Sequence, residues 1–146
     1  MLFKKNLLIR APIRNVWSYI DDIEKQKQWM TNIVDRDEED IDDDTCNIYI
    51  KEGNYVNTYI EKILYIDPPY RLHILMVDKK RNIEIYMDFK LFKEGNYTAL
   101  EYVGEKIIHS LQMKIMTKML GGFFSTIAMN KFFKDMKSFA EASYIK

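Results

Sequence analysis

The chain has 146 residues, the size of one domain, and 47% of them are hydrophobic, enough for a substantial core. Lysine plus arginine equal aspartate plus glutamate at 22 each, so the formal net charge of zero argues against nucleic acid or an anionic membrane as partner. The single cysteine, Cys46, excludes an internal disulfide. No apolar run approaches the roughly 18 residues of a membrane span, and we expect no secretory leader, hence a cytoplasmic protein.

The N-terminal part predicts one strand and two short helices. Residues 3–9 predict the strand, and Pro12 ends it. Proline is favoured in the first turn of a helix, and a helix with an apolar face around Trp17 follows. A second short helix is predicted over residues 23–29. We expect its Trp29 to be buried between helix and sheet.

An acidic segment follows, with eight acidic residues among the ten from Asp35 to Asp44. A calcium loop of the EF-hand type would need glycine at its sixth position and glutamate at its twelfth, where this segment has Asp40 and Cys46. We therefore expect a charged hairpin tip. The one cysteine and two histidines show no zinc-ligand spacing, so we expect no metal and no cofactor.

The middle of the chain predicts a series of antiparallel hairpins. Turn signals recur at short intervals, and the runs between them are rich in isoleucine, tyrosine, valine and threonine. The predicted strands cover residues 45–52, 55–66, 70–79, 82–92 and 97–106.

The positions of the turns predict which residues oppose each other. Paired residues share a face of the sheet, and side chains alternate along each strand. The turns predict the pairs Ile48–Tyr59, Met76–Ile85, Phe89–Leu100 and Met87–Tyr102. One face then collects an apolar set: Cys46, Ile48, Ile50, Tyr59, Ile63, Leu72, Ile74, Met76, Ile85, Met87, Phe89, Leu100 and Tyr102.

Glu61 is the charged residue that this pattern places on the apolar face. An unpaired carboxylate among isoleucines and methionines is costly to bury. Three alternatives follow: an ion pair or a position at the rim, a contact with ligand, or a role as general acid or base.

The opposite face of the sheet carries more apolar side chains than a fully solvated face needs: Ile60, Leu64, Leu75, Val77 and Tyr86. This row indicates a covered face and a contact between two copies of the chain. His73 falls opposite Asp88, which predicts either a surface pair or a catalytic dyad; the surface pair is favoured because no nucleophile is placed to use the dyad.

Residues 111–144 predict one long helix, which the sheet would wrap around. Apolar residues recur at steps of three and four: Ile115, Met119, Phe123, Met129, Phe133, Met136 and Ala140, with a parallel row of Met116, Leu120, Phe124 and Ile127. Gly121-Gly122 interrupts the pattern. The two glycines predict a kink, a thin place beside a bound ligand, or close packing on the sheet.

The chain resembles the START-like, or SRPBCC, superfamily, and is most similar to its polyketide cyclase/dehydrase-like branch. Nearly the whole chain carries the resemblance, although the segment before Cys46 is acidic where the family often has glycine. The matching motifs are Ala11-Pro12 with Val16-Trp17 and Trp29, then Asp67-Pro68-Pro69-Tyr70-Arg71-Leu72, Thr98-x-Leu100-x-Tyr102, and residues 133–141. The resemblance implies a single α+β domain over residues 1–146 with the helix-grip fold: a seven-stranded antiparallel sheet around a long C-terminal helix, with a cavity between them. Members bind apolar molecules such as lipids or polyketides, some are enzymes, and no catalytic residue is common to all.

Three functions are compatible with this pattern. The first is binding or carrying a small hydrophobic ligand, and the second is a cyclase or dehydratase in which Glu61 and Tyr59 or Tyr102 act as acid and base. The third is a partner-binding domain with a filled core. The first predicts a cavity near Gly121-Gly122, lined by Tyr59, Glu61, Ile74, Met87, Leu100, Tyr102, Met116, Leu120 and Phe123.

Overall fold

The computed structural model describes residues 1–37, 44–120 and 124–145, without the side chains of 116–120 and 145. The EF-hand test position Asp40, the Gly121-Gly122 pair and Phe123 therefore lie outside the described residues. The elements are β1 (Leu2–Ile9), α1 (Ile13–Asp21), α2 (Ile23–Trp29), β2 (Ile33–Arg36), β3 (Thr45–Glu52), β4 (Tyr55–Asp67), β5 (Arg71–Asp78), β6 (Ile83–Glu94), β7 (Tyr97–Ile108), α3 (Leu111–Leu120) and α4 (Thr126–Ile145).

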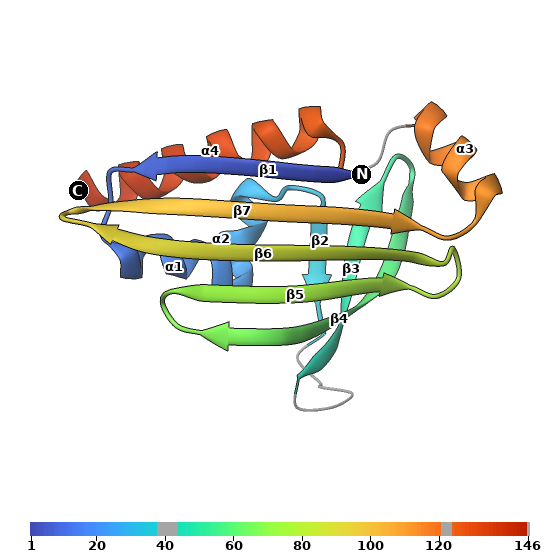
Figure 1. Cartoon of the computed structure of the whole chain (residues 1–146), viewed down its shortest axis with the longest axis horizontal. Helices are drawn as coiled ribbons and strands as arrows, with labels where there is room; N and C mark the ends of the chain where they lie inside the picture. Colours follow the sequence, from blue (N-terminus) through green and yellow to red (C-terminus); the bar gives the residue numbers. More distant parts are fainter. Residues whose placement is uncertain (38–43, 121–123, 146) are drawn as a thin grey trace.

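One antiparallel sheet organises the molecule. Its seven strands are ordered β1-β7-β6-β5-β4-β3-β2, so the hairpins from β3 to β7 are neighbours and β1 returns to the far side of β7. Figure 1 shows α4 running alongside β1, and α1 and α2 behind the sheet in this view. The helix α3 lies at the end where β7 finishes. The predicted seven-stranded α+β helix-grip architecture is confirmed.

The strand pairing confirms most of the predicted register. Ile48 opposes Tyr59 and Met76 opposes Ile85, as the turn positions predict. Of the apolar set predicted for the inner face, Ile63 is half-buried and all the others are buried. Alternation therefore identified the inner face correctly.

The pairs predicted between β6 and β7 are wrong by two residues. Met87 opposes Gly104, and Tyr102 opposes Phe89. The cause is the turn, which consists of Gly95 and Asn96 alone instead of four residues, with Gly95 at the positive φ of 66° that a tight hairpin turn needs. A slip of two residues keeps every side chain on its face, so Met87 and Tyr102 are both still buried.

The single helix predicted over residues 111–144 is two helices in the structure. Ser125 begins the second, because its Oγ accepts a hydrogen bond from the Ala128 amide at 3.1 Å, as an N-cap residue does. The split turns part of the predicted apolar face outward: Ile115 is 57% exposed and Ile127 is 85% exposed. The rest of the predicted face holds along α4, where the buried residues include Met129, Phe133, Met136 and Ala140.

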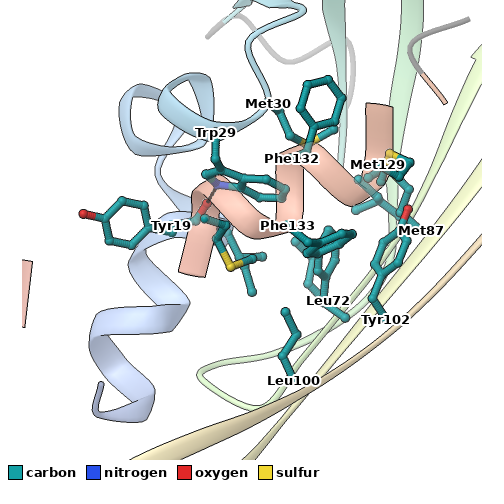
Figure 2. Packing of buried hydrophobic residues seen from close by; sticks show 14 of the residues in the cluster. Tyr19, Trp29, Met30, Leu72, Met87, Leu100, Tyr102, Met129, Phe132 and Phe133 are labelled. Atoms are coloured by element: carbon teal, nitrogen blue, oxygen red, sulfur yellow. Dashed lines mark hydrogen bonds between the residues drawn. The ribbon is translucent and has the colours of Figure 1, made fainter. Parts of the chain in front are cut away.

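An aromatic cluster fills the interior beside α4. Phe133 lies between Trp29 and Tyr102, with ring centroids 5.5 and 4.6 Å away (Figure 2). Trp29 is fully buried and its Nε1 donates to the Tyr19 carbonyl at 2.7 Å. The prediction that Trp29 is buried between helix and sheet is confirmed.

Candidate functional site

The inner face of β7 carries an unusual charged residue, Lys106. Alternation along the strand points Tyr102, Gly104 and Lys106 to the same side, and the Lys106 residue is only 7% exposed. Within the described part of the chain its ammonium makes no hydrogen bond or ion pair, but it is not one of the fully buried polar atoms without a partner, which are Arg36 Nε and Tyr102 Oη. Burial lowers the pKa of Lys106, while attraction to Glu52 opposes that shift.

Tyr102 places a second polar group beside the same stretch of β7. The residue is 1% exposed, and its hydroxyl has no hydrogen-bond partner among the described residues. A Cβ added at Gly104 would lie 2.4 Å from Tyr102 Oη and 2.5 Å from Phe124 Cζ, so the hydroxyl and the Phe124 ring together fill the space over this glycine. Burial raises the pKa of the Tyr102 phenol well above its ordinary value, so it remains protonated.

Several predicted site residues meet around Gly104. Met87 faces Gly104 across the β6–β7 pair, and Ile74 faces Met87 across the β5–β6 pair. In Figure 2 the hydroxyl end of Tyr102 is directed toward Met87. Ile74, Met87 and Tyr102 therefore share the inner face of three neighbouring strands, and their role as lining of a site stays a prediction.

Tyr59 belongs to a separate polar cluster at the ends of β3, β4 and β5. Its hydroxyl donates to Glu52 Oε1 at 2.8 Å and accepts from Arg81 Nη2 at 2.8 Å. Arg81 also binds Glu52 Oε1 at 2.7 Å and Asp78 through Nε. Burial opposes the charge of Arg81, but the hydrogen bond to Asp78 raises its pKa, and burial raises the pKa of Tyr59. The members of this cluster satisfy one another.

Glu61 lies in an ion pair, which is the first of its three predicted alternatives. Its carboxylate contacts Arg36 Nη2 at 3.1 Å, and the same nitrogen donates to Gln26 Oε1 on α2 at 3.1 Å. Cys46 donates its thiol to Glu61 Oε1 at 3.9 Å. The carboxylate thus joins α2, β2, β3 and β4, and Arg36 Nε is buried without a hydrogen-bond partner among the described residues.

The remaining predicted lining residues are placed differently. Leu100 opposes Leu91 and belongs to the packed core. The side chains of Met116 and Leu120, together with Phe123, are outside the description. The predicted cavity near Gly121-Gly122 remains a prediction.

Sequence reasoning missed Lys106, Gly104 and Arg81. Alternation from Tyr102 would have placed Gly104 and Lys106 on the inner face, because they are two and four residues further along the same strand. Arg81 gave no such signal, since it lies in the turn after β5 and reaches the cluster through the folded geometry.

On the outer face, His73 and Asp88 are opposed as predicted. Asp88, however, accepts two hydrogen bonds from Arg71, from Nε at 3.1 Å and from Nη2 at 3.0 Å. This engagement supports a surface pair over a catalytic dyad.

Within the described ranges, no group of three His, Cys, Asp or Glu side chains is arranged to hold a metal ion, and no helix is long and apolar enough to cross a membrane.

Comparison with solved structures identifies the architecture. A conserved protein from Geobacillus kaustophilus superposes with a TM-score of 0.76 at 17% identity, covering 99% of this chain and 97% of that chain. The Zhui aromatase/cyclase from a Streptomyces species gives 0.74 at 9% identity, with 97% and 93% covered. Ara h 8.0201 gives 0.64 at 11% identity, with 97% and 98% covered.

The chain has the helix-grip fold. The resemblance seen in the sequence is confirmed at this level, over nearly the whole chain. No family model and no curated protein matches the sequence significantly. Identities of this size establish a shared fold and leave the function to be argued from the site.

Proposed function

We propose that the chain binds a small apolar molecule between the inner face of the sheet and its helices. The observation that carries the proposal is the Tyr102 hydroxyl on the inner face of β7, which is buried without a hydrogen-bond partner among the described residues. Buried polar groups are nearly always hydrogen-bonded, so a buried hydroxyl without a partner beside apolar side chains is a feature of ligand sites. The similar Zhui aromatase/cyclase and Ara h 8.0201 have the same overall fold.

The acid–base alternative has weaker support. Two of the three groups that a cyclase or dehydratase was predicted to use are engaged elsewhere: Glu61 with Arg36, and Tyr59 with Glu52 and Arg81. A general acid or base must be free to exchange a proton with substrate. We therefore place binding ahead of catalysis, and the apolar ligand ahead of a partner-binding domain with a filled core.

A fluorescence titration with the neutral apolar dye N-phenylnaphthylamine tests the proposal. We expect saturable binding by the wild-type chain and strong loss of binding in Met87→Trp, because the larger ring takes up room between the inner face of the sheet and its helices. Tyr86→Trp is the matched control, because Tyr86 is next to Met87 on β6 and its side chain lies on the opposite face of the sheet. A cooperative thermal unfolding transition for each variant is the check that both variants are folded. A wild-type chain that binds no dye, and that carries no small molecule in native mass spectrometry, contradicts the proposal.

A further inference from the structure

The helix α3 turns one face away from the rest of the molecule, and this face is apolar. Leu111 is 74% exposed and Ile115 is 57% exposed, and a spacing of four residues puts both side chains on one side of the helix. Met113 lies on the opposite side of α3 and packs against the core, which fixes the face that points outward. Two large apolar side chains exposed on one short helix indicate an interaction surface.

The tip of the β3–β4 hairpin adds an exposed aromatic residue at the same end of the sheet. Tyr55, the first residue of β4, is 76% exposed. Arg81 in the β5–β6 turn donates to Glu52 Oε1 at 2.7 Å, which ties that turn to the β3–β4 tip. The same turn is tied to the segment before α3, because the His109 amide donates to the Asn82 carbonyl at 3.1 Å. Figure 1 shows α3 and the two hairpin turns at one end of the molecule.

This end of the molecule is positively charged, although the whole chain has a net charge of zero. Residues 106–134 include five lysines and no aspartate or glutamate. Lys114 is exposed beside the apolar pair on α3, and Lys79 and Lys80 are exposed in the β5–β6 turn. None of these three side chains forms an ion pair within the described part of the chain. The zero net charge, from which we expected no attraction to an anionic membrane, therefore conceals an uneven distribution.

The carboxylates at this end do not cancel the lysines. Glu52 and Asp78 both bind Arg81. Glu84 lies 3.4 Å from the imidazole of the histidine before α3. Glu105 is exposed on the outer face of β7, and the three unpaired lysines outweigh it.

We propose that α3 and the β3–β4 tip dock on the surface of a bilayer that contains anionic lipid. Leu111, Ile115 and Tyr55 enter the boundary between headgroups and acyl chains, and the lysines contact the lipid phosphates. A bilayer is favoured over a protein partner because it requires no complementary shape, whereas a stable protein interface buries about 800 Å² on each partner. This inference goes beyond the proposed function and does not depend on it.

Co-sedimentation with vesicles tests the inference. Vesicles of phosphatidylcholine alone are compared with vesicles of an equal mixture of phosphatidylcholine and phosphatidylglycerol. We expect the wild-type chain to bind the anionic vesicles about tenfold or more tightly, because each lysine near an anionic surface contributes about fivefold. Added salt should weaken this binding, because it screens the exposed charges.

Two sets of substitutions assign the effect to α3. Leu111→Ser combined with Ile115→Ser should weaken binding about tenfold or more, since both changes remove apolar area from the interface. Leu8→Ser is the matched control, because Leu8 is exposed near the opposite end of β1. Lys114→Gln should weaken binding about fivefold, with Lys93→Gln at the distant β6–β7 hairpin as its control. A cooperative thermal unfolding transition is the check that each variant is folded.

The outcomes separate the bilayer from other partners of α3. Equal binding to neutral and anionic vesicles, or no binding to either, refutes the proposal. If a second copy of the chain covers this face instead, the wild-type chain does not bind vesicles, and the double substitution on α3 dissociates a dimer in sedimentation. The dye titration above measures a separate property, so either proposal can fail while the other stands.

Discussion

Replacing Gly104 by alanine tests the packing on which the candidate site depends. The added Cβ would lie 2.4 Å from Tyr102 Oη, 2.5 Å from Phe124 Cζ and 2.9 Å from Tyr102 Cε1. Carbon atoms in contact are about 3.5–4.0 Å apart, so both rings must retreat by about 1 Å. The Tyr102 ring is held by Phe133 at 4.6 Å and by Phe89 at 5.0 Å, which leaves it little room.

Overpacking of this kind costs about 1–3 kcal/mol. Alanine also restricts the unfolded chain, which offsets about 0.4–1 kcal/mol. We therefore expect Gly104→Ala to lower the free energy of unfolding by about 1–2 kcal/mol, measured by urea denaturation with an unchanged m-value.

A double-mutant cycle shows whether the Tyr102 hydroxyl is the cause. Tyr102→Phe removes the oxygen nearest the new methyl group, so Gly104→Ala should cost about 0.5–1 kcal/mol less in that background. The reasoning is refuted if Gly104→Ala leaves stability unchanged, or if its cost is the same with and without the hydroxyl.

Four further substitutions test individual contacts. Tyr102→Phe alone should raise the free energy of unfolding by about 1 kcal/mol, since it removes a buried hydroxyl without an acceptor; a loss of stability would show that the hydroxyl has a partner. Lys106→Met should also be more stable than wild type at neutral pH, and the difference should shrink as the pH rises toward 10.5, because the buried native amine loses its proton before the unfolded one; a difference that does not change with pH would contradict this reasoning. Arg36→Met should cost about 2–3 kcal/mol by leaving the Glu61 carboxylate buried and unpaired, and Glu61→Gln in the same chain should recover part of it; a cost near zero would show that the pair is not needed. Leu75→Lys on the outer face should shift sedimentation from dimer toward monomer, and a wild-type chain that is monomeric at high concentration rules out the dimer.

The sequence alone determined the sheet and its inner face. Turn residues located the hairpins, and alternation with period two then assigned each strand residue to a face. This assignment survived the error between β6 and β7, because a slip of two residues, from Met87–Tyr102 to Met87–Gly104, changes partners without changing faces. The order and spacing of weak motifs also led to the fold that the solved structures share.

Only the tertiary structure decided how the polar groups on that face are paired. Glu61 finds Arg36 on β2, and Tyr59 finds Arg81 in the turn after β5, so each partner comes from a different strand or turn. Local pattern does not encode such contacts, since they depend on how the sheet curves and where side chains reach. The break before α4 was hidden for a similar reason, because the apolar periodicity continues through Ser125, where the helix begins anew.

The candidate site illustrates both contributions. Strand alternation in the sequence is sufficient to place Tyr102 and Lys106 on the inner face of β7. Whether a buried donor is satisfied depends on every acceptor within about 3 Å of it, and those acceptors belong to residues far away in the chain. The folded structure commits Glu52 and Asp78 to Arg81, and it leaves the Tyr102 hydroxyl buried without a hydrogen-bond partner among the described residues.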